Sequence, residues 1–359
     1  MTQDVRVSRW TELDVHPGGH ATGRLVVSET YVGADIAIPF SVVRGKRDGP
    51  AVFVTAAVHG DEINGTGAIR HMLTQQPFML DAGTLVMVPV VNLMGFERHS
   101  RYLPDRRDLN RSFPGSASGS LAARLAHAVF KGLVRPCQYG IDLHTAAVRR
   151  TNFPNIRANM NQPEAADFAR AFGAELTVHG KGPEGSLRAA AVDAGIPTLI
   201  LEAGEVWKVE PTYVEHVVRG VRNCLIHLGM VEGKPEPPAY RIEVDESRWV
   251  RAEHGGFLSF HIGPGSIVTK GEPIATNTDL LGREKNVIEA PRSGIVLGMT
   301  TIPSVAPGDP ICHIAYPSKG ELRKAEAAQD ALHGQHLHER TREDLARNMH
   351  VSEAPETRD

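Results

Sequence analysis

Apolar runs alternate with amphipathic segments along the first two thirds of the chain. Short apolar runs bounded by turn residues are typical of buried strands, and they occupy residues 51–58, 84–90, 139–143 and 197–201. Segments with apolar residues at helical spacing predict helices, and they occupy residues 65–73, 120–133, 163–172, 186–194 and 211–228. Because strands that alternate with helices form a sheet covered by helices on both faces, this part of the chain predicts an α/β domain.

The pattern changes after residue 232. Residues 233–240 begin with Gly-Lys-Pro-Glu-Pro-Pro, a composition typical of an interdomain linker. Residues 241–317 consist of short β runs rich in Gly and Pro, and we expect a small all-β domain there. Residues 318–359 are charged and rich in Ala, Glu and Arg, and we expect a mobile helix or a disordered tail.

An internal repeat lies within the all-β part. Six positions recur at an offset of 38 (252 to 290) that falls to 37 (274 to 311): Ala252, Gly256, Val268, Gly271, Pro273 and Ile274 return as Ala290, Gly294, Val305, Gly308, Pro310 and Ile311. Two β halves of matching pattern are expected to pack face to face as a sandwich.

Composition narrows the class of protein. The 359 residues are 41% hydrophobic and 23% charged, which is enough for a core of ordinary size. The net charge of −3 gives no overall positive potential that would attract nucleic acid or an anionic membrane. No apolar run reaches the length of about 18 residues that a membrane-spanning helix needs. Residues 1–10 are polar and lack the apolar core of a signal peptide. Cys137, Cys224 and Cys312 lie too far apart for a disulfide framework or a cysteine-rich zinc site. We expect a cytoplasmic protein without nucleic-acid or membrane partners.

His59 and Glu62 come directly after the first buried strand, where α/β sheets place their ligand sites. A His and a Glu three residues apart reach a common point if a helical turn begins there. An imidazole and a carboxylate suit zinc, which needs two or three more ligands. The alternative is a polar turn that caps a helix.

His144 stands at the end of another strand, in the sequence Ile-Asp-Leu-His-Thr. Strand alternation is expected to point Asp142 to the opposite face, unless a bulge intervenes. A single His at such a place is usually a hydrogen-bonded core residue. Two strand-end imidazoles and one carboxylate, with a position left for water, are instead the ligand set of a hydrolytic zinc centre.

Glu202 ends a third strand. A free carboxylate beside a zinc-bound water would be its general base. Glu205 is the competing candidate, although a solvated loop charge is the favoured interpretation of that residue.

A dense polar stretch covers residues 98–115 and holds five arginines: Arg98, Arg101, Arg106, Arg107 and Arg111. One interpretation is a solvated surface loop. The other, modestly favoured because the chain is not basic overall, is a cationic wall for an anionic substrate. Arg binds carboxylates through two parallel donors, and the neighbouring Asn110 can add another.

Five motifs occur in order: His59-Gly60-Asp61-Glu62, Arg101-Tyr102, Asp108-Leu109-Asn110-Arg111, Asp142-Leu143-His144-Thr145 and Leu201-Glu202-Ala203-Gly204. Together they resemble the succinylglutamate desuccinylase/aspartoacylase family, a branch of the zinc carboxypeptidase fold, over about residues 51–230. The resemblance implies a mixed central sheet with helices on both faces, in a zinc hydrolase domain over residues 1–232 with an N-terminal β extension. Residues 241–317 resemble the barrel-sandwich, lipoyl-like module of many bacterial members.

The resemblance also implies roles for single residues. One Zn²⁺ per chain is bound by His59, Glu62 and His144; Glu202 is the general base that activates the zinc-bound water; Arg101 stabilises the oxyanion; Asn110 and Arg111 bind the substrate carboxylate. The residues that recognise the acyl group do not align, and Arg149, Arg150 and Arg157 are open candidates. The hairpin at residues 282–287 lacks the Met-Lys-Met of a lipoyl carrier, so an unmodified structural or oligomerising module is expected. His333, His336 and His338 of the tail receive no role.

These expectations amount to a zinc-dependent amidohydrolase that cleaves the linear amide of a small anionic N-acyl amino acid. Two alternatives stay open. A metallocarboxypeptidase acting on short peptides uses the same ligands but needs an open groove. A non-catalytic scaffold that kept the fold predicts loss of a ligand or of the base, and here all four positions are filled. A homo-oligomer also stays open.

Overall fold

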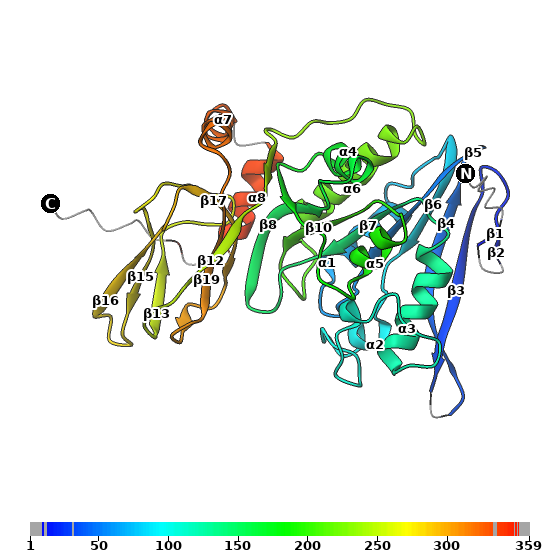
Figure 1. Ribbon diagram of the computed structural model, residues 1–359, viewed down its shortest axis with the longest axis horizontal. Helices are drawn as coiled ribbons and strands as arrows, with labels where there is room; N and C mark the ends of the chain where they lie inside the picture. The colour runs from blue at the N-terminus through cyan, green and yellow to red at the C-terminus, as the bar shows by residue number, and fades with distance from the viewer. Residues whose placement is uncertain are drawn as a thin grey trace.

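The computed structural model describes residues 9–10, 13–30, 32–332, 336–347, 349 and 351. A 13-stranded sheet runs through the molecule (Figure 1). Its main path is β12 (Ser247–Arg251), β19 (Pro310–Ala315), β17 (Gly294–Thr300), β8 (Arg150–Ala158), β10 (Thr198–Gly204), β7 (Tyr139–His144), β5 (Arg47–Ala56), β6 (Ala82–Val88), β4 (Asp35–Arg44) and β3 (His20–Glu29). The four strands β10, β7, β5 and β6 are parallel, whereas β8, β17, β4 and β3 are antiparallel to their neighbours on this path. The sheet is therefore mixed, as the resemblance implied.

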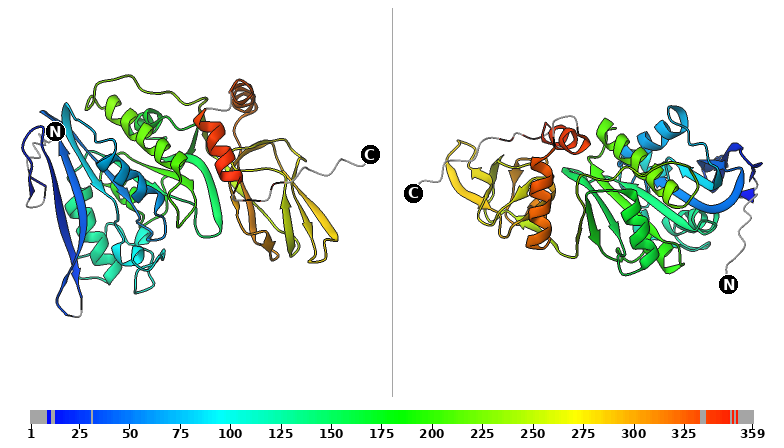
Figure 2. Two further views of the ribbon diagram at one scale, coloured as in Figure 1. Left: turned by 180° about the vertical axis from the view of Figure 1, so that it is seen from behind. Right: turned by 90° about the horizontal axis from the view of Figure 1, so that it is seen from above.

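Helices cover both faces of the sheet, because its central strands are apolar on both sides. In β5, Val52 and Val54 join one core cluster and Phe53 joins the other, as strand alternation requires. One face is covered by α1 (Asn64–Thr74), α4 (Pro163–Phe172) and α6 (Pro211–His227), and the other by α3 (Leu121–Val129) and α5 (Leu187–Asp193) (Figure 2). Every strand and helix predicted for this part is present, with ends that differ by a few residues, and α3 continues into the π-turn Phe130–Val134.

The apolar pattern missed β8 and its parallel neighbour β9 (Leu176–His179). The sequence of β8, Arg-Thr-Asn-Phe-Pro-Asn-Ile-Arg-Ala, is too polar for a strand buried in an apolar core. Nevertheless β8 pairs with β10 on one side and with β17 on the other. Several of its polar side chains line the pocket described below, which explains their presence in the middle of a sheet.

The C-terminal strands form two sheets around one apolar cluster. A four-stranded sheet contains β16 (Glu284–Glu289), β15 (Pro273–Thr278), β13 (Gly256–Phe260) and β18 (Ser304–Val305). The facing strands β12, β19, β17 and β14 (Ile267–Val268) belong to the large sheet, and Phe260, Ile274 and Ile311 pack between the two. A further strand, β11 (Ile242–Val244), pairs with β9. The lipoyl-like assignment of this part stays a prediction.

The sequence repeat has a structural counterpart. Its glycine positions begin β13 and β17, and its proline positions begin β15 and β19. Gly271 and Gly308 both have positive φ angles, of 87° and 89°. The Gly271 amide donates to the Ala290 carbonyl at 2.8 Å, and the Gly308 amide donates to the Ala252 carbonyl at 2.7 Å. Each half therefore completes a turn of the other.

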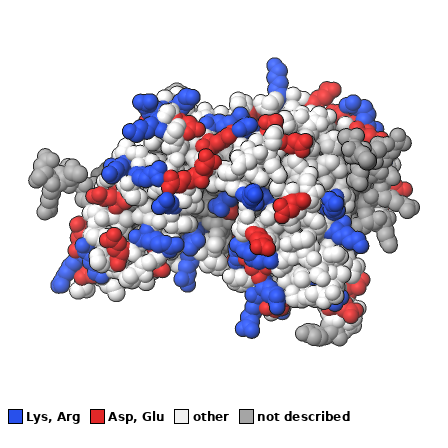
Figure 3. All heavy atoms as spheres, viewed as in Figure 1, with Lys and Arg blue, Asp and Glu red and all other residues white. Residues whose placement is uncertain are grey.

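The described part of the tail contains α7 (Lys319–Asp330) and α8 (Leu337–Ala346). His338 of α8 is fully buried, and its Nδ1 lies 2.8 Å from Glu175 Oε2. A disordered tail is therefore wrong for residues 336–347, while His333 lies outside the described residues. None of the helices in the described ranges has the length and apolarity that crossing a bilayer requires. Figure 3 shows Lys and Arg interspersed with Asp and Glu over the face in view, in keeping with the small net charge.

Candidate metal centre and pocket

Three neighbouring parallel strands bring the candidate residues to one edge of the sheet. His59 follows β5, His144 ends β7, and Glu202 lies in β10 in register with His144. The Glu62 amide donates to the His59 carbonyl at 3.2 Å, which closes the turn that leads into α1. A Cβ at Gly60 would lie only 2.1 Å from the Gly95 carbonyl carbon. Only glycine therefore fits at position 60, because the backbone at Gly95 passes too close to this turn for any side chain.

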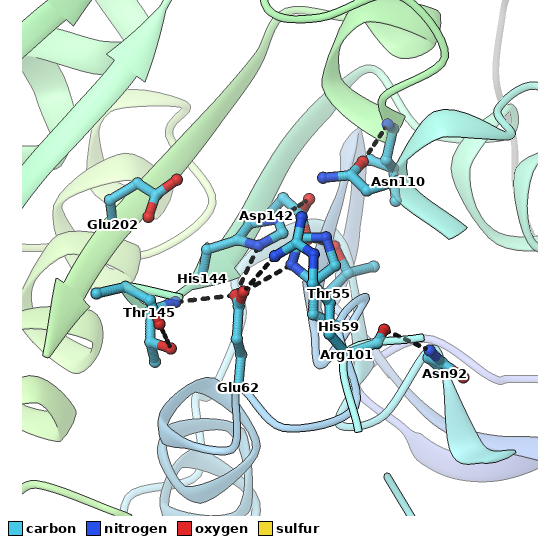
Figure 4. Close-up of polar contacts among 12 residues, drawn as sticks. Thr55, His59, Glu62, Asn92, Arg101, Asn110, Asp142, His144, Thr145 and Glu202 are labelled. Carbon is cyan, nitrogen blue, oxygen red and sulfur yellow. Dashed lines mark hydrogen bonds and ion pairs between the residues drawn. The ribbon is translucent and has the colours of Figure 1, made fainter. Parts of the chain in front are cut away.

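The carboxylate of Glu62 faces both imidazoles (Figure 4). His59 Nδ1 lies 2.7 Å from Glu62 Oε1, and His144 Nδ1 lies 2.9 Å from Glu62 Oε2. All three side chains are buried, and they offer one ligand atom each within 4.8 Å of one another. Two imidazole nitrogens and a carboxylate form a donor set that suits zinc, so these residues fit a divalent ion.

The second nitrogen of each imidazole faces another carboxylate. His144 Nε2 lies 2.8 Å from Asp142 Oδ2, and Thr55 Oγ1 donates to Asp142 Oδ1 at 2.7 Å. His59 Nε2 lies 3.3 Å from Asp108 Oδ1. A metal-binding imidazole usually has such a partner for its other N–H. The expectation that Asp142 points to the opposite face is wrong, because residues two apart in a strand share a face.

The pKa shifts follow from these contacts. Burial alone would raise the pKa of Glu62, but the two imidazoles outweigh it and hold that pKa well below its ordinary value. Burial would lower the pKa of His144, yet Asp142 and Glu62 raise it well above its ordinary value. Glu62 also outweighs burial at His59, whose pKa is raised. The charged Glu62 carboxylate therefore stabilises positive charge on the groups that face it.

Two of the five arginines in the polar loop, Arg101 and Arg111, line the pocket. The other three are exposed to solvent and do not line it. Arg101 lies 3.4 Å from Glu62 Oε1 through Nη1 and 2.9 Å from Asp108 Oδ2 through Nη2. The loop that carries these arginines follows the short helix α2 (Leu93–Phe96) and ends in the 3₁₀ turn η1 (Leu109–Arg111).

Asp108 and Asn110 fix this loop. The Asn110 amide donates to Asp108 Oδ1 at 2.8 Å, and the Leu187 amide at the start of α5 donates to Asn110 Oδ1 at 2.8 Å. Arg111 Nη1 donates to the Asn110 carbonyl at 2.6 Å. Asn110 and Arg111 both line the pocket, from a turn tied to Asp108 and to α5.

The pocket has a volume of about 350 Å³ and is lined by residues of both the α/β part and the C-terminal β strands. Trp249 of β12 and His313 of β19 line it, with their rings stacked at 4.8 Å between centroids. The Arg150 guanidinium lies 4.7 Å from the Trp249 ring centroid. Of the arginines left open for the acyl group, Arg150 and Arg157 line the pocket and Arg149 does not.

Glu202 and Glu205 have different surroundings. Glu202 lines the pocket, where its Oε2 accepts a hydrogen bond from Asn152 Nδ2 at 3.2 Å and its Oε1 lies 3.8 Å from Arg157 Nε. Glu205 does not line the pocket, and its Oε2 pairs with Lys208 Nζ at 2.9 Å. Figure 4 shows Glu202 on the strand next to that of His144.

Sequence reasoning gave no role to several residues that this geometry involves, among them Asp108, Asn152, Arg188, Trp249 and His313. Asp108 stood within a quoted motif, two residues before Asn110. Nothing in the local sequence marks the others, because their position depends on contacts between elements that are distant in the chain.

Fold and site thus define an α/β protein with a candidate metal centre at the carboxyl edge of its parallel strands. A family model for the succinylglutamate desuccinylase/aspartoacylase catalytic domain matches residues 48–228. The chain belongs to the succinylglutamate desuccinylase/aspartoacylase family.

A curated relative, the N-alpha-acetyl-L-2,4-diaminobutyric acid deacetylase of Halomonas elongata, is 29% identical over 325 residues, which cover 86% of this chain and 94% of the relative. A succinylglutamate desuccinylase/aspartoacylase from Rhodobacter sphaeroides has a similar solved structure, with a TM-score of 0.73, 27% identity and coverage of 86% of this chain and 98% of that one. The product-bound ectoine utilization protein EutE (DoeB) from Ruegeria pomeroyi has a TM-score of 0.74 at 24% identity, covering 84% and 97% of the two chains, and shares the fold.

Proposed function

We propose that this protein is a zinc-dependent amidohydrolase that removes the acyl group from a small anionic N-acyl amino acid. The observation that carries the proposal is the buried group of His59, Glu62 and His144 in a pocket that also holds Glu202. One Zn²⁺ per chain fits this donor set. Bound there, the ion supplies Lewis acidity that lowers the pKa of a water toward about 7 and polarises the amide carbonyl.

The side chains around that group supply the remaining chemistry. Glu202 accepts a proton from the attacking water as the new C–O bond forms, and returns it to the leaving nitrogen as the C–N bond breaks. Arg101 donates to the carbonyl oxygen while negative charge develops there. Its contacts with Asp108 and Glu62 hold it in place beforehand.

Polar and cationic side chains of the pocket anchor the substrate. Asn110 and Arg111 bind the substrate carboxylate, and this places the amide carbonyl next to the attacking water. Arg188 supports an anionic substrate further, because it is only 4% exposed, its Nη1 donates only to the neutral Gly180 carbonyl at 2.7 Å, and its buried Nε has no hydrogen-bond partner among the described residues. Burial, together with the nearby Arg157, lowers the pKa of Arg188 to about 10. A bound anion compensates such a charge.

The size of the pocket favours a deacylase over a carboxypeptidase. Trp249 and His313 line a cavity of about 350 Å³, a volume suited to a small ligand. A peptide substrate needs a groove that continues beyond the scissile bond. The acetylated amino acid named for the Halomonas elongata relative agrees with a small substrate. A scaffold protein is disfavoured because all four site positions are filled and come together.

Metal analysis and a deacylation screen test the proposal together. The screen covers N-acetyl, N-succinyl and N-formyl derivatives of acidic, basic and neutral amino acids, with short peptides as the competing substrates. We expect about one zinc per chain and hydrolysis of at least one N-acyl amino acid. Glu202→Gln should keep its zinc and lose activity by about two to four orders of magnitude, whereas the matched Glu205→Gln should stay active. A zinc content near zero, or an active Glu202→Gln, would contradict the proposal, and turnover of peptides alone would favour the carboxypeptidase.

A further inference from the structure

The carboxylate of Glu202 is held by β8, the polar strand beside it. Asn152 of β8 is buried, and its Nδ2 donates to Glu202 Oε2 at 3.2 Å. Asn155, further along β8, donates to the backbone carbonyl of Glu202 at 3.3 Å. One strand thus binds both the side chain and the main chain of the proposed general base.

A β-bulge makes this double contact geometrically possible. Glu202 lies opposite Asn155, and Gly204 lies opposite Asn152, so three residue steps on β8 span two on β10. In a regular strand, residues three apart point to opposite faces. The extra residue falls at Phe153 or Pro154, and a bulge tolerates proline because it interrupts the hydrogen-bond ladder. The bulge therefore redirects the Asn152 side chain toward Glu202.

The other edge of β8 pairs with the C-terminal strand β17, where Gly298 lies opposite Asn152. A Cβ at Gly298 would lie 2.4 Å from Asn152 Oδ1 and 2.7 Å from the Thr151 carbonyl oxygen. Both distances are shorter than real Cβ contacts allow. The missing side chain of Gly298 therefore leaves the space that the Asn152 amide occupies when it reaches Glu202.

We propose that Asn152 is a positioning residue for the Glu202 carboxylate, and that Gly298 of the C-terminal β strands preserves the conformation in which Asn152 does so. The inference rests on the proposed function, because it takes Glu202 to be the group that moves the proton. Asn152 occupies one carboxylate oxygen and so fixes the direction of the other. Without that contact the carboxylate can rotate away from the water, and a misplacement of about 1 Å can cost about 100-fold in rate.

The test compares kcat, KM and zinc content of four variants, assayed with the N-acyl amino acid that the wild-type chain hydrolyses fastest in the screen above. Asn152→Ala removes the amide, and Asn152→Asp keeps its shape but replaces the donor by a second carboxylate. We expect both to lower kcat by about 10- to 100-fold, with KM and zinc content close to wild type. The near-isosteric Asp variant guards against a packing defect as the explanation.

Gly298→Ala should also lower kcat, since its Cβ displaces the Asn152 side chain and presses on the Thr151 carbonyl oxygen. The double variant Asn152→Ala/Gly298→Ala should then lose less than the two single losses combined, because part of each change acts through the same side chain. Gly320→Ala is the matched control: a Cβ there meets nothing within 4 Å, and wild-type kinetics are expected.

The outcomes separate this inference from the proposed function. An inactive Glu202→Gln combined with wild-type kcat in both Asn152 variants would overturn the positioning role and leave the proposed function standing. Additive losses in the double variant would show that Gly298 acts independently of Asn152 and would overturn its part. An active Glu202→Gln, or a wild-type chain that hydrolyses no derivative, would overturn the proposed function and this inference with it.

Discussion

Replacing Asp108 by Asn should weaken zinc binding without removing any ligand. Asp108 Oδ1 lies 3.3 Å from His59 Nε2, and its Oδ2 lies 2.9 Å from Arg101 Nη2. Burial would raise the pKa of Asp108, but contacts with His59 and Arg101 hold it well below its ordinary value, so the carboxylate is charged. Asn keeps an oxygen for the Asn110 amide and the shape of the turn, and it removes the negative charge.

The size of the effect follows from the two partners that lose this charge. Loss of the carboxylate partner of a ligating imidazole lowers metal affinity by about 10- to 100-fold, or about 1.4 to 2.8 kcal/mol of binding free energy. The upper end is expected here, because Arg101 also loses its closest counter-charge. Its guanidinium, already 3.4 Å from Glu62 Oε1, then competes more strongly with the metal for that ligand.

Competition with a chromophoric chelator at neutral pH measures the zinc affinity of the wild-type, Asp108→Asn and Asp105→Asn proteins. Asp105 is the matched control: it lies on the same loop, and its carboxylate pairs with Arg107 at 3.7 Å, away from the metal centre. We expect wild-type affinity for Asp105→Asn. Wild-type affinity for Asp108→Asn as well would refute the idea that this carboxylate orients His59.

Three further predictions concern binding, pocket size and pH. Arg111→Ala should chiefly raise KM, as steady-state kinetics would show, and an unchanged KM would remove Arg111 from the carboxylate site. Trp249→Ala should widen the pocket and raise kcat/KM for bulkier N-acyl groups relative to N-acetyl, which a substrate series would measure; an unchanged preference would mean that Trp249 does not limit size. Burial, with Arg219 and other nearby cations, holds the pKa of His216 well below its ordinary value, so this His is neutral in the folded chain. The unfolded chain takes up a proton there as the pH falls below about 6.5, so stability is lost on the acid side. The free energy of unfolding, measured with urea between about pH 7.5 and 5, should therefore fall less steeply in His216→Gln than in the wild-type chain. The same fall in both proteins would show that other groups cause it.

The sequence predicted those parts of the fold whose side chains serve an apolar core. The run at residues 51–58 is a buried strand in the structure, because both of its faces meet helices. The same logic failed for β8, whose Asn152 and Arg157 face a polar pocket instead. The pattern of apolar residues along a sequence reveals strands that are buried against apolar groups. It does not reveal a strand such as β8, whose polar side chains line a pocket.

The meeting of the candidate ligands was predictable because His59 and Glu62 follow one strand of the parallel set and His144 ends its neighbour. His59 and His144 needed only the rule that such ends meet at one edge. Asp142 was assigned to the wrong face, an error that counting residues along the strand corrects. The contribution of Trp249 and His313 could not be predicted, since it depends on β17 pairing with β8 across some 140 residues of chain.

That pairing also determines how the protein can be divided. On the edge of β8 that faces away from β10, β17 pairs with Arg150–Asn152 and β9 pairs with Asn155–Ala158 (Figure 1). Cutting the chain at residue 240 would remove β17 from β8 and β11 from β9. The main-chain amides and carbonyls uncovered on these two strands are a template for sheet extension between molecules. A chain shortened to residues 1–240 is therefore expected to aggregate rather than to retain a folded pocket with a wider entrance.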